Sequence, residues 1–203
     1  MIKKTLAKAD QASESTLQEF NHLEIAQHDM RFAYLHGYPG VVVSGIMWLV
    51  SACVALNMSA ERAVWALLIG GVFIHPLSIL LNKVLGSSGV HNPSNPLGRL
   101  AMEGTLFMIL CMPLAYGLSF HKVEWFFQGM LLIIGGRYFH FATLYGSKLY
   151  WVLGIGLGVA AILLFIMRAP SPITLLVGAA IEIAFGVVML MITRTRKTPQ
   201  ITN

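Results

Sequence analysis

The sequence predicts an all-α membrane protein, a polytopic bundle of six transmembrane helices preceded by an N-terminal amphipathic helix. Of its 203 residues, 56% are hydrophobic and 11% are charged, whereas soluble domains carry about 25% charged residues. Six apolar stretches have the length of about 20 residues that crosses a hydrocarbon core of about 30 Å. These stretches are residues 39–56, 62–81, 98–120, 123–146, 149–167 and 172–193. They occupy nearly all of the chain after residue 38, so no separate soluble catalytic domain is expected.

The first 38 residues form a polar segment that is predicted to be cytoplasmic. Apolar side chains recur there every three or four residues among charged ones, the pattern of an amphipathic helix: Leu17, Phe20, Leu23, Met30 and Tyr34. Two interpretations stay open. The helix either lies on the inner membrane surface and leads into the first span, or serves as a gate or dimer arm. Residues 1–8 are basic but lack an apolar core, so a cleaved signal peptide is not expected.

The basic residues predict the topology. If the N-terminus is cytoplasmic, ten of the 14 Lys and Arg residues fall on the cytoplasmic side, and Arg62, Lys122 and Arg168 fall outside. Because cytoplasmic loops are enriched in Lys and Arg, both termini are predicted to be cytoplasmic. Residues 39–193 then form the transmembrane domain and residues 194–203 form a basic tail. This bias accounts for the net charge of +5, so a nucleic-acid partner is not expected.

The longest connection between spans is the loop at residues 86–98, which contains two Asn-Pro steps and three glycines. Such residues favour turns over a continued helix. The loop is predicted either to be a stiff turn or to contribute binding residues, with His91, Asn92 and Asn95 as candidates. The other connections are short, which makes consecutive helices antiparallel neighbours.

Prolines and glycines shape the spans themselves. Pro76 in the second span and Pro113 in the third each remove a backbone hydrogen bond, so both helices are expected to bend or open locally. The freed carbonyls are either ligands or are satisfied by neighbouring groups. Glycines in the fifth and sixth spans predict close helix packing: Gly154, Gly158, Gly178 and Gly186.

The second and fourth spans share an internal repeat without gaps, residues 66–83 and 131–148. The repeat pairs four small or polar positions at a spacing that keeps them on one helix face: Gly71 with Gly136, His75 with His140, Ser78 with Thr143, and Asn82 with Ser147. A polar stripe in hydrocarbon must face protein, a cavity or water. The two helices are therefore predicted to line a shared polar interior.

Two opposite charges fall near the middle of the bilayer. At about 1.5 Å per residue, Arg137 and Glu182 both lie roughly 16 to 18 Å from the cytoplasmic boundary. An unpaired charge at that depth costs about 2.5 to 3.5 kcal/mol on insertion scales, so the two residues are predicted to form an ion pair. The pair is either a lock between the fourth and sixth helices or a contact that opens during a transport cycle.

A second group of ionisable residues, His75, Glu103 and His140, is predicted nearer the cytoplasmic boundary. Three roles stay open: structural polar residues, a pathway for a solute or proton, or a metal or catalytic centre. A pathway would include the neighbouring residues Ser78, Asn82 and Thr143. No helical metal motif such as His-Glu-x-x-His is present, so no metal ligand, cofactor or catalytic residue is assigned.

Five strings carry a resemblance to a known family: YPGVVVSG at 38–45, NPLGRLAMEG at 95–104, PLAY at 113–116, WFFQGMLLIIGGRY at 125–138 and FATLYG at 141–146. Through them the chain resembles an uncharacterised family of bacterial multi-pass membrane proteins, a domain of unknown function. The resemblance covers most of the chain after Asp29. It implies a bacterial inner-membrane protein and transfers no activity and no functional residues.

The favoured hypothesis is binding or passage of a small polar solute or ion through the bundle interior, with a homodimer enclosing the pathway. One alternative is a structural or regulatory membrane subunit whose ionisable residues hold helices together. Another is a small intramembrane enzyme that uses His75, His140 and Glu103. Transport predicts a water-accessible cavity reaching Glu103 and His75, an enzyme predicts bound metal or a lipid-facing cleft, and a structural role predicts neither.

Overall fold

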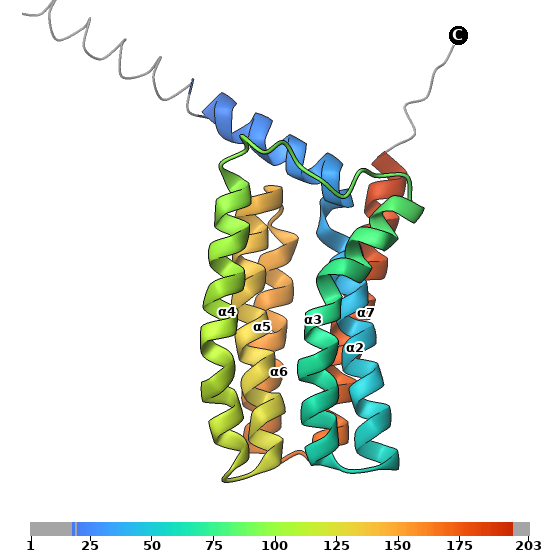
Figure 1. Ribbon diagram of the computed structural model, residues 1–203, viewed down its shortest axis with the longest axis vertical. Helices are drawn as coiled ribbons and strands as arrows, with labels where there is room; N and C mark the ends of the chain where they lie inside the picture. The colour runs from blue at the N-terminus through green and yellow to red at the C-terminus, as the bar shows by residue number, and fades with distance from the viewer. Residues whose placement is uncertain (1–17, 19, 197–203) are drawn as a thin grey trace, which may run out of the picture.

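The computed structural model describes residue 18 and residues 20–196, with side chains up to residue 193. All regular structure in this part of the chain is helical, which confirms the predicted fold class. A helix over residues 20–34 leads through the 3-10 turn η1 (Leu35–Gly37) into six long helices (Figure 1). These are α2 (Tyr38–Asn57), α3 (Ala60–Val84), α4 (Leu97–Ser119), α5 (Val123–Tyr145), α6 (Leu149–Ile166) and α7 (Ser171–Arg196). The basic residues within 1–17 and 197–203, on which the predicted topology partly depends, lie outside the described part of the chain.

Five helical segments are long and apolar enough to cross a membrane, the first being Phe20–Asn57, which includes α2. α5 is the remaining long helix, and Gln128, Arg137 and His140 interrupt its apolar run. It is also well enclosed by its neighbours, since eleven of its residues are buried against three in α4. The chain is therefore a multi-pass membrane protein, and its inner helix α5 carries several polar side chains.

The six long helices pack as two groups of three (Figure 1). α2 packs most extensively against α7 and α3, and α5 packs most extensively against α6 and α4. The groups meet through α7, which contacts α5 and α6, and through a smaller contact between α3 and α5. The helices are thus joined more extensively within each group than between the groups.

Glycines allow close approach at several of these contacts. A Cβ on Gly154 of α6 would lie 2.7 Å from the carbonyl oxygen of Gly135 on α5, so the two backbones touch there. A Cβ on Gly178 or Gly186 would likewise contact side chains of α2, which confirms the packing predicted for these glycines. Gly158 differs, because a Cβ there would meet nothing within 4 Å.

The helix at residues 20–34 crosses the end of the bundle where the loop after α3 and the end of α7 lie (Figure 1). Its junction with α2 is a left-handed turn in which Leu35, His36 and Gly37 have φ values of 50°, 59° and 81°. Gly37 is required there, because a Cβ would clash with the side chains of Tyr145 and Tyr150. The junction is therefore fixed by packing as well as by backbone conformation.

Both internal prolines lie inside continuous helices, Pro76 in α3 and Pro113 in α4. α3 bends in its second half (Figure 1), the part that contains Pro76. A proline ring and its missing N–H commonly bend a membrane helix without ending it. The predicted bend is thus present in α3, and neither helix ends at its proline.

Candidate functional site

One carboxyl group is enclosed where α2, α5 and α7 meet. Glu182 on α7 is 0% exposed, and its Oε1 accepts a hydrogen bond of 2.8 Å from the Tyr138 hydroxyl on α5. Gly45 of α2 lies against it, since a Cβ there would be 3.2 Å from the Glu182 Cβ. The Glu182 Oε2 makes no hydrogen bond of good geometry, and the buried Ser44 side chain of α2 is the other polar group beside the carboxyl. One oxygen of this buried carboxyl group is therefore well hydrogen-bonded and the other is not.

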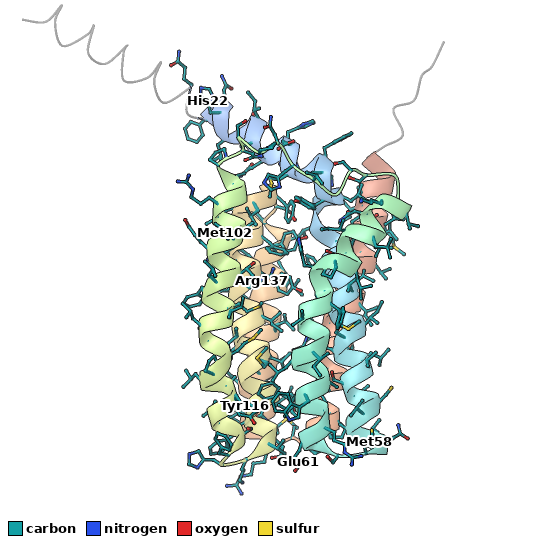
Figure 2. The ribbon with its side chains drawn as sticks, viewed as in Figure 1. His22, Met58, Glu61, Met102, Tyr116 and Arg137 are labelled. Atoms are coloured by element: carbon teal, nitrogen blue, oxygen red, sulfur yellow. The ribbon has the colours of Figure 1, made fainter. Side chains whose placement is uncertain are left out.

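Arg137 directly precedes Tyr138 on α5 and points toward α4. Its guanidinium donates to the Thr105 hydroxyl at 3.3 Å and to the Met108 sulfur at 3.5 Å, and its Cζ lies 5.4 Å from the centroid of the Phe141 ring. Figure 2 shows Arg137 between the two ends of the bundle, at roughly 12 Å along α5 from the end of that helix. All three of these partners are uncharged.

Arg137 and Glu182 do not form the ion pair predicted from the sequence, because each side chain binds other groups. Consecutive residues on an α-helix point about 100° apart, so when Tyr138 faces α7, Arg137 faces α4. The prediction considered the depth of the two charges and not their directions around the helix. The charges remain close enough to interact through space.

His140 extends the side of α5 that Arg137 occupies, because residues three apart are neighbours on a helix. Its ring packs against Gly104 of α4, where a Cβ would lie 3.2 Å from the His140 Cγ. The His140 Nδ1 is buried and has no hydrogen-bond partner. α4 and α5 thus hold two basic side chains one turn apart.

His75 and Glu103 do not join this arrangement, since both side chains are exposed on the described chain. No three His, Cys, Asp or Glu side chains of the described residues form a group that could hold a metal ion. The metal or catalytic centre considered for His75, Glu103 and His140 is therefore not assembled. Its ligands would come from three helices, and α3 and α4 turn two of them outward.

The polar residues of the repeat bond largely within their own helices. Ser78 donates to the His75 carbonyl oxygen at 2.8 Å, and Asn82 donates to that of Ser78 at 2.9 Å. Ser and Asn side chains often bond to the preceding turn in this way. Asn82 is buried, whereas Thr143, at the position that pairs with Ser78, is exposed. The two helices therefore do not present equivalent polar stripes to one interior.

The loop candidates fasten the N-terminal helix to the bundle. The Asp29 Oδ2 accepts hydrogen bonds from the Asn92 backbone N–H at 3.0 Å and the Asn95 Nδ2 at 2.8 Å. His91 Nδ1 and the Tyr34 hydroxyl share a hydrogen bond of 2.8 Å. These contacts are made within the chain, which favours the stiff turn over the binding loop.

The N-terminal helix also caps α5. Gln27 Nε2 donates to the Thr143 carbonyl oxygen at 2.8 Å, and an Arg31 guanidinium nitrogen donates to that of Tyr145 at 3.0 Å. The last four carbonyl groups of a helix lack partners within it, and a cation beside them is favourable. The described part of this helix is therefore docked on the end of the bundle.

A cavity of about 170 Å³ lies beside this cap. It is lined by His28, Arg31 and His36 from the N-terminal helix and η1, and by Ser87 and Thr193 from the loop after α3 and from α7. His75 and Glu103 do not line it, so it is not the cavity predicted for a pathway through those residues. Its side chains are basic or neutral.

Tyrosines connect this end of the bundle with Glu182. The Tyr150 hydroxyl donates to the His36 carbonyl oxygen at 2.6 Å. The Tyr150 ring stacks on the Tyr138 ring with centroids 6.1 Å apart, and Tyr138 bonds to Glu182. Buried aromatic residues with polar tips therefore extend from the cavity to the carboxyl group.

Comparison with known families assigns the chain to a protein family. The model of the family of unknown function DUF7010 matches residues 23–194. The chain belongs to this family. The resemblance inferred from the sequence strings, to an uncharacterised domain family, is thereby confirmed. No curated protein and no solved structure matches this DUF7010 chain.

Tyr138 is the residue of this DUF7010 protein that the sequence analysis missed. A tyrosine hydroxyl buried in hydrocarbon needs a hydrogen-bond partner, and its place beside Arg137 put it at the depth of Glu182. That signal was present in the sequence. The caps by Gln27 and Arg31 gave no such signal, because they depend on how the N-terminal helix crosses the end of α5.

Proposed function

We propose that this DUF7010 protein binds and passes a small polar solute or ion across the membrane through the interior around α5, beside the junction of its two three-helix groups. The observation that carries the proposal is the Glu182 carboxyl, which is buried with one oxygen bonded to Tyr138 and the other, beside Ser44, without a hydrogen bond of good geometry. Buried polar groups in proteins are nearly always paired. Ionisable residues inside membrane segments commonly mark solute or proton pathways.

The energetics favour a binding role for this carboxyl over a purely structural one. Burying an ionised group costs several kcal/mol unless it is paired and fully hydrogen-bonded. A well-packed apolar side chain at position 182 would join α5 and α7 without that cost. A carboxyl with one unsatisfied oxygen is therefore better explained by something that it binds during function.

The helix arrangement suits movement at this junction. Contacts between the two groups are fewer than contacts within them, and alternating access commonly arises when one helix group moves as a unit against another. Tyr138 belongs to one group and Glu182 to the other. A shift between the groups would break or remake their hydrogen bond and so change what Glu182 can bind.

The proposal includes a bacterial cytoplasmic membrane, two cytoplasmic termini and a homodimer. The distribution of Lys and Arg supports the orientation. Exposed polar side chains support the dimer, because Glu103 and His75 lie on membrane-spanning helices and are exposed on the single chain. Contact of such groups with lipid is costly, and a second copy packed on α3 and α4 would shield them.

Flux through liposomes tests this function. The purified chain is reconstituted, and passage of protons, chloride and potassium is followed with entrapped indicators in the wild type and in Glu182→Gln. We expect at least one probe to cross faster than in empty liposomes, and we expect its net flux to fall to background in the variant. Glu61→Gln is the matched control, because it makes the same change at an exposed site. If every probe crossed wild-type liposomes only at the background rate, transport would be excluded as the function.

A structural role is the second candidate, and the Tyr138–Glu182 hydrogen bond favours it because it links the two helix groups. In that case Glu182→Gln would lower the thermal unfolding temperature in detergent, and the wild type would carry no flux. Measuring unfolding and flux on the same preparations separates the two functions.

A further inference from the structure

We infer that the solute is a small anion, held by the Arg137 guanidinium, and that it crosses together with one proton carried by Glu182; this inference rests on the proposed function. Three features of the interior support it. These are the uncharged partners of Arg137, the unsatisfied ring nitrogen of His140 and the balance of charge between Arg137 and Glu182.

Arg137 is a permanent cation whose hydrogen-bond partners are a hydroxyl and a thioether, from Thr105 and Met108. A guanidinium has five N–H donors in a fixed planar fork that matches carboxylates and oxoanions. Charged residues in membrane helices normally pair with one another or with backbone carbonyls. An anion would provide the charged partner that the described residues do not place against Arg137.

His140 offers a second donor on the same side of α5. Its Nδ1 is buried without a hydrogen-bond partner, and an imidazole Nδ1 that carries a proton donates to an anion. Gly104 lets the ring lie against the α4 backbone, so the side chain is held toward the α4–α5 contact that Arg137 also faces. Two donors one helical turn apart fit a small anion better than a cation.

The end of the bundle also favours anions. The cavity beside the N-terminal helix is lined by Arg31, His28 and His36, and no acidic side chain lines it. Electrostatic attraction raises the local concentration of oppositely charged solutes in such a recess. The described residues thus offer basic groups to an anion at the end of the bundle and again at Arg137.

Charge balance couples the anion to a proton. With Glu182 ionised, the charges of Arg137 and Glu182 sum to zero, and they interact through space. An anion bound to Arg137 would leave a net negative charge in hydrocarbon, which is costly. A proton on Glu182 restores neutrality, so anion and proton each favour binding of the other.

The groups around Glu182 leave it as the proton carrier. From α5 it faces Tyr138 and, through space, Arg137. Tyr150 of α6 stacks on Tyr138, and its hydroxyl donates a hydrogen bond to the His36 carbonyl oxygen. From α2, Ser44 and Gly45 lie beside it, and neither side chain titrates. Arginine stays protonated, so the carboxyl is the group in this contact set that can take up and release a proton.

Anion-driven acidification of liposomes tests the inference. Inward gradients of chloride, nitrate, inorganic phosphate or succinate are imposed, and internal pH is read with an entrapped dye alongside uptake of the labelled anion. We expect at least one of these anions to enter the wild-type liposomes and acidify them. Arg137→Gln should lower uptake and acidification by about tenfold or more, because it removes a charge-assisted contact from a buried site.

Glu182→Gln separates the two parts of the inference. It should abolish acidification yet keep exchange of labelled for unlabelled anion, which also shows that the variant is folded. Arg62→Gln and Glu61→Gln make the same changes at exposed positions and should behave as the wild type. Acidification that persists in Glu182→Gln would overturn the coupling, and unchanged anion uptake in Arg137→Gln would overturn the site.

Two cationic or neutral probes distinguish failure of this inference from failure of the proposed function. If potassium or glycerol crosses and none of the four anions does, the anion specificity is wrong and the proposed function stands. If no probe crosses in the wild type, the proposed function is wrong, and so is this inference, which rests on it.

Discussion

Two carboxyl groups in this DUF7010 protein are held in opposite ways. Asp29, at the end of the bundle, accepts hydrogen bonds from both Asn92 and Asn95 on one oxygen. Glu182, in the interior, accepts a hydrogen bond from Tyr138 on one oxygen, and its other oxygen, beside Ser44, has no hydrogen bond of good geometry. Low dielectric makes an unsatisfied polar group more costly in the interior. The more costly location therefore has the poorer hydrogen bonding, the reverse of what stability alone favours.

The difference indicates a fixed end and an adjustable interior. The N-terminal helix, the loop after α3 and the end of α5 are joined by side-chain hydrogen bonds. In the interior, buried polar atoms of Glu182, His140, Trp48 and Gln128 have no hydrogen bond of good geometry among the described residues, and the Asn82 Oδ1 near the loop after α3 has none either. A binding site needs a rigid frame around groups that stay available, and the chain separates these two requirements between two regions.

Gly37→Ala should have the largest effect, because Gly37 joins the two regions. Its φ of 81° disfavours any side chain, and a Cβ would clash with Tyr145 and Tyr150. We expect a loss of about 3 kcal/mol or more in the free energy of unfolding, measured by thermal or denaturant unfolding in detergent. Gly86→Ala is the control, since its φ is 83° but a Cβ there meets nothing within 4 Å. Equal losses in both variants would show that packing at the junction contributes nothing.

Tyr138→Phe should have the second-largest effect, because it removes the hydrogen bond that Glu182 accepts. A bond to a charged group contributes about 1.5 to 3 kcal/mol, and a loss of that size in the free energy of unfolding is expected. Tyr138→Phe combined with Glu182→Leu should regain most of it, since no buried carboxyl is then left unpaired. If the double variant lost as much free energy of unfolding as the two single variants added together, the two residues would not interact. The double variant should carry no flux whatever its stability.

The sequence predicted the fold further than the site. Apolar length and the spacing of breaks located all six long helices, five of which belong to segments long and apolar enough to cross a membrane. It also identified Arg137 and Glu182 as buried charges at similar depth. It could not predict their partners, because contacts depend on the rotation of each helix, and a step of one residue turned Tyr138 rather than Arg137 toward α7. For the same reason His75 was expected inside and is exposed.

Asp29→Ala should have a smaller effect that is confined to the end of the bundle. It removes the acceptor shared by Asn92 and Asn95, and a loss of about 1 to 2 kcal/mol in local stability is expected. Hydrogen exchange should then rise over residues 86–98 and remain unchanged in α5 and α7. Glu24→Ala is the matched control, because that carboxyl is exposed on the same helix. A fall in liposome flux in Asp29→Ala would show that the two regions are coupled.

Gln27→Ala should have the smallest effect of these substitutions. It removes the donor to the Thr143 carbonyl oxygen at the end of α5, which is worth about 0.5 to 1.5 kcal/mol as a neutral hydrogen bond. Gln27→Glu should be worse than Gln27→Ala, because a negative charge beside the last carbonyl groups opposes the helix dipole. Asn21→Ala, at an exposed position of the same helix, is the control. If hydrogen exchange at the end of α5 gave the same rates for alanine and glutamate at position 27, the Gln27 contact would be packing rather than a helix cap, and the N-terminal helix would cap α5 through Arg31.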